Sequence, residues 1–306
     1  MKPFRFGVLI EADVQSRATM LDLARRAEGE GYNIILGTDH LGRLASLQLL
    51  QAAAAETRLR IGTLVLNNDF RHPVLLAQEL AALDVVTDGR LEIGLGAGWA
   101  RDEYDGAAMA FGRPGQRLAR LRSSVAIIKQ ALSEGRIERP EGDPYGAIHL
   151  DGMPRSIQRP HPPLLIGGGG PKTLSYAASE AQIVGLDPRA YPEGGHVATD
   201  VTEALFDEKV GWIRKAAGER LSELEVNVII FDVDPGYRSG AGGTSIDIGE
   251  LTIDEVAGSP HYLLGDTEAM VDRLVERRER WGINYLAIKP RHMDVLAPVV
   301  ARLAGT

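Results

Sequence analysis

Short hydrophobic runs alternate along this chain with longer segments in which apolar residues recur every three or four positions. The short runs predict buried strands, and the periodic segments predict amphipathic helices. The predicted strands are 4–10, 33–36, 60–66, 91–95, 163–166, 182–186, 225–233 and 283–288. The predicted helices are 16–31, 46–56, 73 to a stop at 88–89, 115–135, 172–179, 201–217, 266–281 and 294–304.

Strict alternation of strands and helices predicts an α/β fold with parallel strands joined by right-handed crossovers. Eight such repeats favour a closed (β/α)8 barrel, and the competing interpretation is an open doubly wound sheet. The barrel is preferred because the polar loops all follow strands. Since such barrels commonly run to about 250 residues as one domain, we expect a single barrel domain over residues 1–306.

Two polar segments interrupt the alternation and predict insertions in the barrel. Residues 136–160 are polar and rich in proline and glycine, and residues 234–260 contain many glycines around 236–243. Neither segment contains a motif of recognisable chemistry. We expect both to shape the side of the site that receives the substrate.

The stretch from residue 60 to 104 contains one complete strand–helix–strand unit. Pro73 suits the first turn of its helix, where a missing N–H costs little, and Asp88-Gly89 predicts the stop. Polar and glycine residues follow both strands, at 67–72 and 96–104. Because sites in parallel α/β folds lie at the carboxyl ends of strands, these two segments are predicted to be two walls of one site.

Composition narrows the class of protein. The formal net charge is −8 and the pI is about 5.5, which argues against nucleic-acid binding by a basic face. The absence of cysteine excludes disulfides and thiolate catalysis. The N-terminus lacks a signal-peptide core, and no apolar run approaches the roughly 20 residues that span a bilayer. We therefore expect a cytoplasmic protein without a membrane partner.

A run of four glycines follows the fifth predicted strand and opens a helix: Gly167, Gly168, Gly169 and Gly170, with Pro171, Lys172 and Thr173 after them. Glycines allow backbone N–H groups to approach a ligand, and a helix N-terminus favours an anion. The alternative is a tight turn without a ligand. The run lacks the spacing of a Walker A loop, and residues 94–98 lack the last glycine of the dinucleotide fingerprint.

Asp39 and His40 follow the second predicted strand. A histidine there could donate or accept a proton, or it could be a structural histidine bonded to Asp39. Asp102 and Glu103 follow Trp99, and one of these two carboxylates could accept a hydrogen bond from a ligand, or it could cap the next helix. Asp39, His40 and His72 lack the spacing of a helical metal site, so no metal is predicted.

The chain contains a set of short phrases: D-H at 39–40, G-T-x-V at 62–65, F-R-H-P at 70–73, L-D-V-V-T-D-G-R-L at 83–91, G-L-G-A-G-W at 94–99, E-Y at 103–104 and I-G-G-G-G at 166–170. These phrases resemble the luciferase-like monooxygenase superfamily, and most closely its actinobacterial branch that uses the deazaflavin coenzyme F420. The resemblance covers nearly the whole chain.

The resemblance implies a TIM barrel of the bacterial-luciferase type with inserted loops. It also implies a bulge with a non-prolyl cis peptide at Leu64-Val65, under the ring of the cofactor. His40, near the reactive carbon C5, and Asp39, at the ring edge, are the expected catalytic residues. The expected cofactor-binding residues are Asp39, Leu64, Val65, Asn67, Gly98, Asp102, Gly167, Gly168, Gly169, Gly170 and Lys172.

The expected function is therefore an F420-dependent oxidoreductase that transfers a hydride between deazaflavin C5 and a small organic substrate. One alternative is an FMN-dependent two-component monooxygenase that uses oxygen and a separate reductase, and another is a non-catalytic flavin-binding barrel. The F420 tail carries glutamates, and the candidate cations for it are Lys172, Arg101, Arg189 and Arg291. Analogy with the family implies a homodimer.

Overall fold

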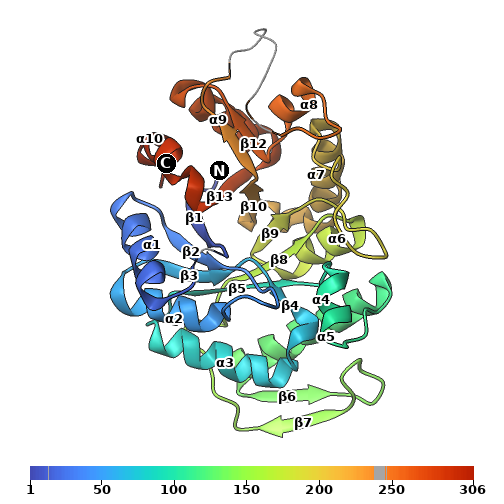
Figure 1. Cartoon of the computed structure of the whole chain (residues 1–306). Helices are drawn as coiled ribbons and strands as arrows, with labels where there is room; N and C mark the ends of the chain where they lie inside the picture. The colour runs from blue at the N-terminus through green and yellow to red at the C-terminus, as the bar shows by residue number, and fades with distance from the viewer. Residues whose placement is uncertain (13, 238–244, 246) are drawn as a thin grey trace.

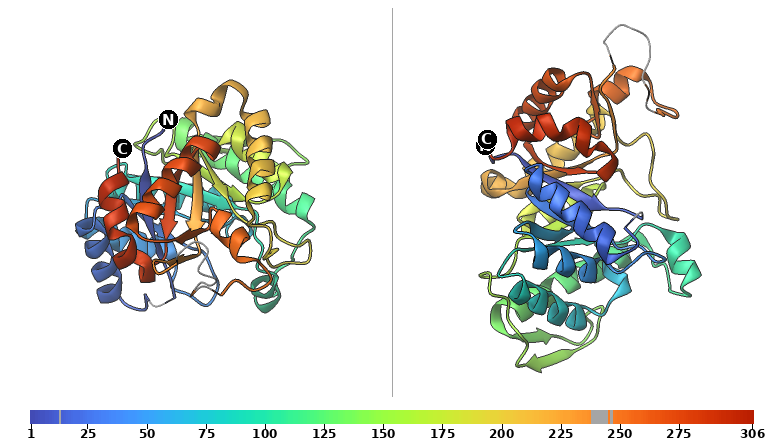
Figure 2. Two further views of the ribbon diagram at one scale, coloured as in Figure 1. Left: turned by 90° about the horizontal axis from the view of Figure 1, so that it is seen from above. Right: turned by 60° about the vertical axis from the view of Figure 1, so that its left-hand side comes forward.

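The computed structural model describes residues 1–12, 14–237, 245 and 247–306, and its centre is a closed ring of parallel strands surrounded by helices (Figures 1 and 2). The order around the ring is β3-β2-β1-β13-β10-β9-β8-β5-β4, and a β3–β5 pairing closes it. The strands are β1 Arg5–Ile10, β2 Ile34–Gly37, β3 Arg60–Thr63, β4 Leu66–Asn67, β5 Leu91–Gly96, β8 Leu164–Gly168, β9 Ile183–Leu186, β10 Glu225–Ile230 and β13 Ile283–Ile288.

The predicted (β/α)8 barrel is confirmed, because β3 and β4 are two pieces of one broken strand and the described strands then occupy eight positions. The open-sheet alternative is wrong, since β3 pairs with β5 across the closure. Leu9, Ile34, Leu36, Leu165 and Tyr285 belong to a cluster of buried residues on these strands. A larger cluster includes residues of both the strands and the helices, so helix packing completes the core.

Proline and glycine mark the ends of several helices. Pro73 is in the first turn of α3, while Gly135 after α5 and Gly282 after α9 adopt φ values of 74° and 77°, the left-handed conformation that favours glycine. No helix among the described residues is long and apolar enough to cross a membrane. The helices are α1 Arg17–Gly29, α2 Ser46–Glu56, α3 Pro73–Val86, α4 Arg101–Gly106, α5 Pro114–Glu134, α6 Pro171–Glu180, α7 Glu203–Ala217, α8 Ile253–Gly258, α9 Thr267–Trp281 and α10 Met293–Leu303.

The third barrel strand is broken at its carboxyl end. The peptide between Leu64 and Val65 is cis, which confirms the bulge that the family resemblance implied. The neighbouring strand β5 accommodates this break through glycine: a Cβ on Gly94 would lie 1.8 Å from the carbonyl oxygen of Thr63. The Thr63 hydroxyl also exchanges hydrogen bonds with the backbone of Gly94, at 2.9 and 2.8 Å.

The two predicted insertions contain structure that the polar pattern did not predict. Residues 136–160 contain an antiparallel hairpin of β6 Arg136–Arg139 and β7 Ile148–Asp151, at the bottom of Figure 1. The second insertion contains α8, and its residues 238–244 and 246 lie outside the described residues.

The predicted strand 225–233 was wrong at its end. Strand β10 stops at Ile230, and β11 Asp232–Asp234 pairs instead with β12 Tyr262–Leu264, outside the barrel. The apolar run continues through the break, so hydrophobicity alone could not locate it.

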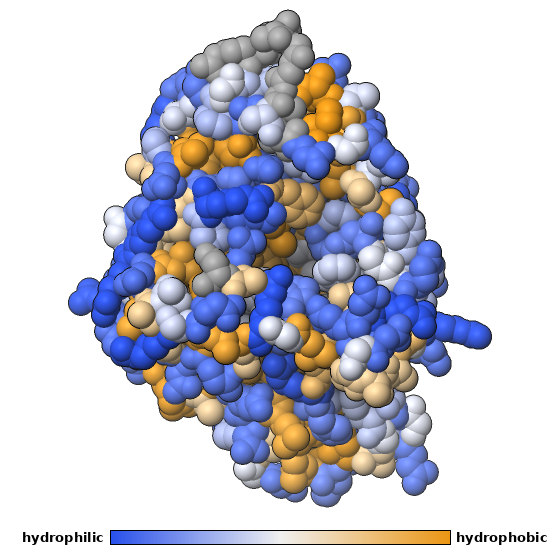
Figure 3. Space-filling model, in the orientation of Figure 1, coloured by the Kyte–Doolittle hydropathy of each residue, from blue (hydrophilic) through white to orange (hydrophobic). Residues whose placement is uncertain are grey.

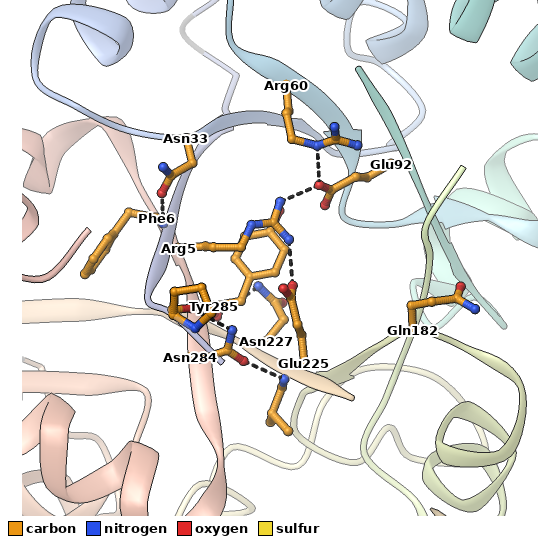
Figure 4. Close-up of polar contacts among 12 residues, drawn as sticks. Arg5, Phe6, Asn33, Arg60, Glu92, Gln182, Glu225, Asn227, Asn284 and Tyr285 are labelled. Atoms are coloured by element: carbon orange, nitrogen blue, oxygen red, sulfur yellow. Dashed lines mark hydrogen bonds and ion pairs between the residues drawn. The ribbon is translucent and has the colours of Figure 1, made fainter. Parts of the chain in front are cut away.

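Charged side chains occupy the amino-terminal end of the barrel (Figure 4). Arg5 bonds Glu92 and also Glu225, the latter at 2.6 Å, and Arg60 donates to Glu92 at 2.6 Å. The Arg5 guanidinium lies 4.4 Å from the ring centre of Tyr285. Because a charge that loses its partner here would be costly to bury, removal of any one partner is expected to destabilise the end of the barrel opposite the predicted site.

Replacing Arg5 with methionine is expected to lower the free energy of unfolding by about 3 kcal/mol, because it leaves Glu225 unpaired and Glu92 with only Arg60. Urea unfolding at neutral pH measures this loss. The control is Arg25→Met, which breaks a more exposed ion pair to Glu56 and should cost less than about 1 kcal/mol. Equal losses in the two variants would contradict the assigned role of the network.

Candidate functional site

A cavity of about 560 Å³ lies at the carboxyl ends of the barrel strands. Polar loops follow the strands at this end, and a hollow is visible near the middle of the face in Figure 3. Most of the residues predicted from the sequence line the cavity together: Asp39, His40, Leu64, Val65, Asn67, Gly98, Gly167, Gly168, Gly169, Gly170 and Lys172. Their roles stay predictions, but the expectation that loops from several strands form one site agrees with this geometry.

Val65 is central to the apolar part of the cavity. A Cβ on Gly96 would lie 2.6 Å from a Val65 methyl, and a Cβ on Gly167 would lie 3.1 Å from the other methyl. Side chains at these two glycines would therefore displace Val65. The combination of glycines and one branched side chain leaves room for a flat ligand above the break in the third strand.

His40 is held by Glu103 of α4. Its Nδ1 lies 2.6 Å from one carboxylate oxygen, and the backbone N–H of Leu41 donates to the other at 3.3 Å. An ionised carboxylate only accepts hydrogen bonds, so Nδ1 carries the proton in the neutral imidazole. Nε2 then has a free lone pair, and among the described residues it has no hydrogen-bond partner.

His40 bonds Glu103 and not Asp39, so the partner expected for a structural histidine is wrong, and Asp39 bonds other residues. Both of its oxygens accept from the Arg71 guanidinium, at 2.7 and 3.1 Å, and one also accepts from the backbone N–H of Asn67 at 3.0 Å. Only 8% of the Asp39 side chain is exposed. This bidentate pair fixes β4 and the start of α3 against β2.

The amide of Asn67 has a fixed orientation. Its Oδ1 accepts from the Tyr104 hydroxyl at 2.9 Å and from the backbone N–H of Asp69 at 3.1 Å. Two donors on Oδ1 leave Nδ2 as the group that Asn67 can offer to a ligand in the cavity. Gly98 has a φ of 79°, and a Cβ there would lie 2.1 Å from the Tyr104 hydroxyl oxygen. Glycine is therefore required beside this pair.

The glycine run combines tight packing with an open helix N-terminus. A Cβ on Gly168 would lie 2.6 Å from a Thr173 side-chain carbon, and one on Gly169 would lie 2.5 Å from the backbone of Asp187. Tight packing thus accounts for these two glycines. Gly170 is different, because within the described part of the chain nothing lies within 4 Å of its Cβ position and no side chain caps α6. The N-terminus of α6 therefore stays open to an anion.

The position of Asp102 does not agree with its predicted role in cofactor binding. It is exposed on α4 and is not among the residues that line the cavity, whereas its neighbour Glu103 is. Successive helical residues point about 100° apart, so only one of the two carboxylates can face His40. The sequence did not reveal the phase of this six-residue helix.

The four cations predicted to attract the cofactor tail differ in position and in partners. Lys172 lines the cavity, whereas Arg101 pairs with Asp105 and Arg291 donates to a backbone carbonyl. Arg189 lines the cavity but bonds Asp200. No group of three residues suited to hold a metal ion occurs within the described ranges.

Sequence reasoning missed Asp187 and His196, which also line the cavity. His196 stacks on Trp99 with ring centres 4.2 Å apart, and its Nε2 lies 3.4 Å from the Asp187 carboxylate. Burial raises the pKa of Asp187, although His196 opposes this effect. Asp187 follows a predicted strand directly, so the rule that found His40 could have found it. No local signal identifies His196.

A buried histidine supports the cavity wall from behind. His261 stacks on Phe231, which lines the cavity, with ring centres 4.2 Å apart and planes 3° apart. Its Nδ1 lies 2.8 Å from the carbonyl oxygen of Ile229, so the neutral ring donates there. Burial lowers the pKa of His261 to about 3.

Acid should therefore destabilise the fold through His261. The unfolded chain binds this proton below about pH 6.5, but the folded chain binds it only near pH 3, so stability is complete above pH 6.5 and falls as the pH decreases. Between pH 7 and 5 the expected loss is about 2 kcal/mol. Urea unfolding at both pH values measures it. In His261→Gln the loss over this interval should shrink by that amount, and an unchanged loss would contradict the assignment.

This chain is similar in sequence to known proteins. A family profile described as luciferase-like monooxygenase matches residues 1–221. An F420-dependent glucose-6-phosphate dehydrogenase from Kineococcus radiotolerans is 30% identical over 186 residues, which are 58% of this chain and 54% of that enzyme. The chain thus matches about half the length of that relative.

Two solved structures share the fold. The coenzyme F420-dependent tetrahydromethanopterin reductase of Methanopyrus kandleri has a TM-score of 0.78 and 20% identity, over 98% of this chain and 99% of that one. An F420-dependent secondary alcohol dehydrogenase in complex with an F420–acetone adduct has a TM-score of 0.76 and 19% identity, over 99% of both chains. At these identities, the likeness establishes the fold alone.

Proposed function

The chain belongs to the luciferase-like monooxygenase family, and we propose that it is an F420-dependent oxidoreductase. It transfers a hydride between deazaflavin C5 and a small organic substrate. The observation that carries this proposal is the His40–Glu103 pair, 2.6 Å between Nδ1 and Oε1, on a histidine that lines the cavity together with Leu64 and Val65. The F420-dependent relatives support the choice of cofactor.

The residues present fit a deazaflavin. Val65 and its flanking glycines offer an apolar surface for the ring, and Asn67 Nδ2 offers a donor to a ring carbonyl. The uncapped N-terminus of α6 and Lys172 suit the phosphate. When bound, the deazaflavin gives or takes the hydride at C5.

His40 would move the accompanying proton. Oxidation of an alcohol releases a hydride from the carbinol carbon and a proton from the hydroxyl, and Nε2 of His40 accepts that proton. Glu103 then stabilises the imidazolium and keeps the ring oriented, since its carboxylate accepts from Nδ1–H. In the reductive direction, the same imidazolium donates the proton to the reduced substrate. The pair therefore serves either direction.

Replacing Glu103 with glutamine is expected to lower kcat by about a hundredfold, because the neutral amide cannot stabilise the imidazolium. F420 affinity should stay nearly unchanged. Stopped-flow measurement of the hydride-transfer rate at several pH values and several F420 concentrations separates the loss of rate from any loss of affinity. A loss that is limited to KM would assign Glu103 a role in binding only.

The alternative within the same family is an FMN-dependent monooxygenase supplied with reduced flavin by a separate reductase. The family's own description as monooxygenases favours this alternative. A third candidate is a barrel that binds a flavin without turnover. Oxygen consumption separates the first two functions, because a reduced deazaflavin reacts poorly with oxygen.

The direct test is turnover with oxidised and reduced F420 against panels of small alcohols and of compounds with activated C=C or C=N bonds. The deazaflavin absorbance and an oxygen electrode are followed together. The proposal expects a change in F420 absorbance without oxygen uptake. Oxygen uptake with reduced FMN, together with no change in F420 absorbance, would contradict the proposal and favour the monooxygenase. The homodimer expected from the family stays a prediction that light scattering would test.

A further inference from the structure

Arg117 is a buried cation that the proposed mechanism does not use. It lies in the first turn of α5, is only 4% exposed, and lines the cavity. Its Nη1 donates to the carbonyl of Gly112 at 2.6 Å, and its guanidinium lies 3.9 Å from the ring centre of Phe111. Its Nε has no hydrogen-bond partner among the described residues, and burial lowers the pKa of Arg117.

No carboxylate within the described ranges forms an ion pair with Arg117. Asp69 attracts it from nearby, but both oxygens of Asp69 are already bonded by Arg120. A buried cation without an anion is costly, and such groups are normally paired. The missing anion would therefore come from a ligand that enters the cavity.

A second cavity, which we name the α5–α6 groove, continues from the first. Its volume is about 680 Å³, and it shares Gly115, Leu118 and Lys172 with the main cavity. Its other walls come from α5 and from the insertion between β6 and β7, namely Ala119, Arg122, Ser123, Arg139, Asp143 and Pro144. The insertion at 136–160 thus forms one side of a passage out of the barrel mouth.

The α5–α6 groove has an excess of positive charge. The acidic residue that lines the groove, Asp143, already has partners that line it too. Its carboxylate accepts a hydrogen bond from the Ser123 hydroxyl at 2.5 Å and pairs with Arg139 at 2.7 Å. Arg122 and Lys172 have no carboxylate partner among the residues that the structure describes. Arg122 lies over the ring of Tyr176 at 5.0 Å, which helps to hold its guanidinium beside the groove.

We propose that the anionic tail of the deazaflavin cofactor leaves the barrel mouth between Gly115 and Lys172 and lies in the α5–α6 groove. Arg117 and Lys172 attract its phosphodiester, and Arg122 attracts the carboxylates of its glutamates. This proposal rests on the proposed function and extends it to the tail. FMN ends at its phosphate, so it would not reach Arg122.

The test compares two probes in equilibrium titrations at low ionic strength. One probe is F420 with its oligoglutamate tail, and the other is the deazaflavin riboside without phosphate or tail. The variant is Arg122→Glu, which is exposed and lies outside the main cavity. The matched control is Arg58→Glu, an exposed arginine just before β3, at the opposite end of the barrel.

Arg122→Glu is expected to weaken F420 binding by about tenfold and to leave riboside binding unchanged. High salt should bring the variant and the wild type together, because the attraction is screened. Arg58→Glu should bind both probes as the wild type does.

Unchanged F420 affinity in Arg122→Glu, with normal riboside binding, would overturn the tail site and leave the proposed function intact. An equal loss for both probes would also overturn it, since the effect would then belong to the ring site. If the wild type bound neither probe, the proposed function and the tail site would fail together.

Discussion

Replacing His40 with glutamine is expected to reduce kcat by about a hundredfold to ten-thousandfold. Glutamine can still bond Glu103, but its amide cannot accept and release a proton as an imidazole does. Proton transfer would then depend on water. F420 affinity should fall by less than about threefold, because His40 is not among the residues expected to hold the phosphate or the floor of the ring. Single-turnover hydride transfer under saturating cofactor measures the loss.

The matched control is His72→Gln. His72 is exposed, caps α3 by accepting from the Val74 N–H at 3.4 Å, and does not line the cavity. Its replacement should leave kcat within about threefold. Added imidazole should restore part of the activity of the His40 variant. A His40 variant with nearly full kcat would remove the proton-transfer role from this residue.

Replacing Gly94 with alanine is expected to cost about 4 kcal/mol or more of folding stability. The new Cβ would lie 1.8 Å from the carbonyl oxygen of Thr63, and a backbone atom cannot rotate away as a flexible side chain can. The change would separate β3 from β5 where the barrel closes. Urea unfolding and the yield of folded protein measure the loss of stability. The amount of bound cofactor should fall in proportion to the amount of folded protein.

Gly211→Ala is the control for this loss. Gly211 lies within α7, and no atom of the residues that the structure describes lies within 4 Å of its Cβ position. Alanine favours a helix over glycine, so this variant should be as stable as the wild type or up to about 1 kcal/mol more stable. If Gly94→Ala were as stable as the control, the close approach of the two strands would not exist in solution.

Most of the fold could be predicted because its signals are local. The apolar period and the caps located α2 at its observed bounds and most other helices within a few residues. The break between β3 and β4 required the family resemblance, since Leu64 and Val65 continue an apolar run. The departure of the chain from the barrel after Ile230 was missed for the same physical reason.

The site residues that lie near the ends of strands could be predicted from the sequence. Asp39 and His40 come shortly after β2 and Asn67 is the last residue of β4, and the barrel brings them to one edge. Glu103, His196 and Arg117 could not be assigned in this way, because their positions depend on how α4 and α5 are rotated and on contacts between distant loops. Asp102 was chosen in place of Glu103 for that reason.

The most direct test of the central claim is a pair of equilibrium titrations, with oxidised F420 and with FMN, followed by tryptophan fluorescence. Trp99 lines the cavity, so a bound ring should quench it, and Trp99→Phe identifies its share of the signal. We expect F420 to bind at least about tenfold more tightly than FMN. Tighter binding of FMN would contradict the account and favour oxygen chemistry with a reductase.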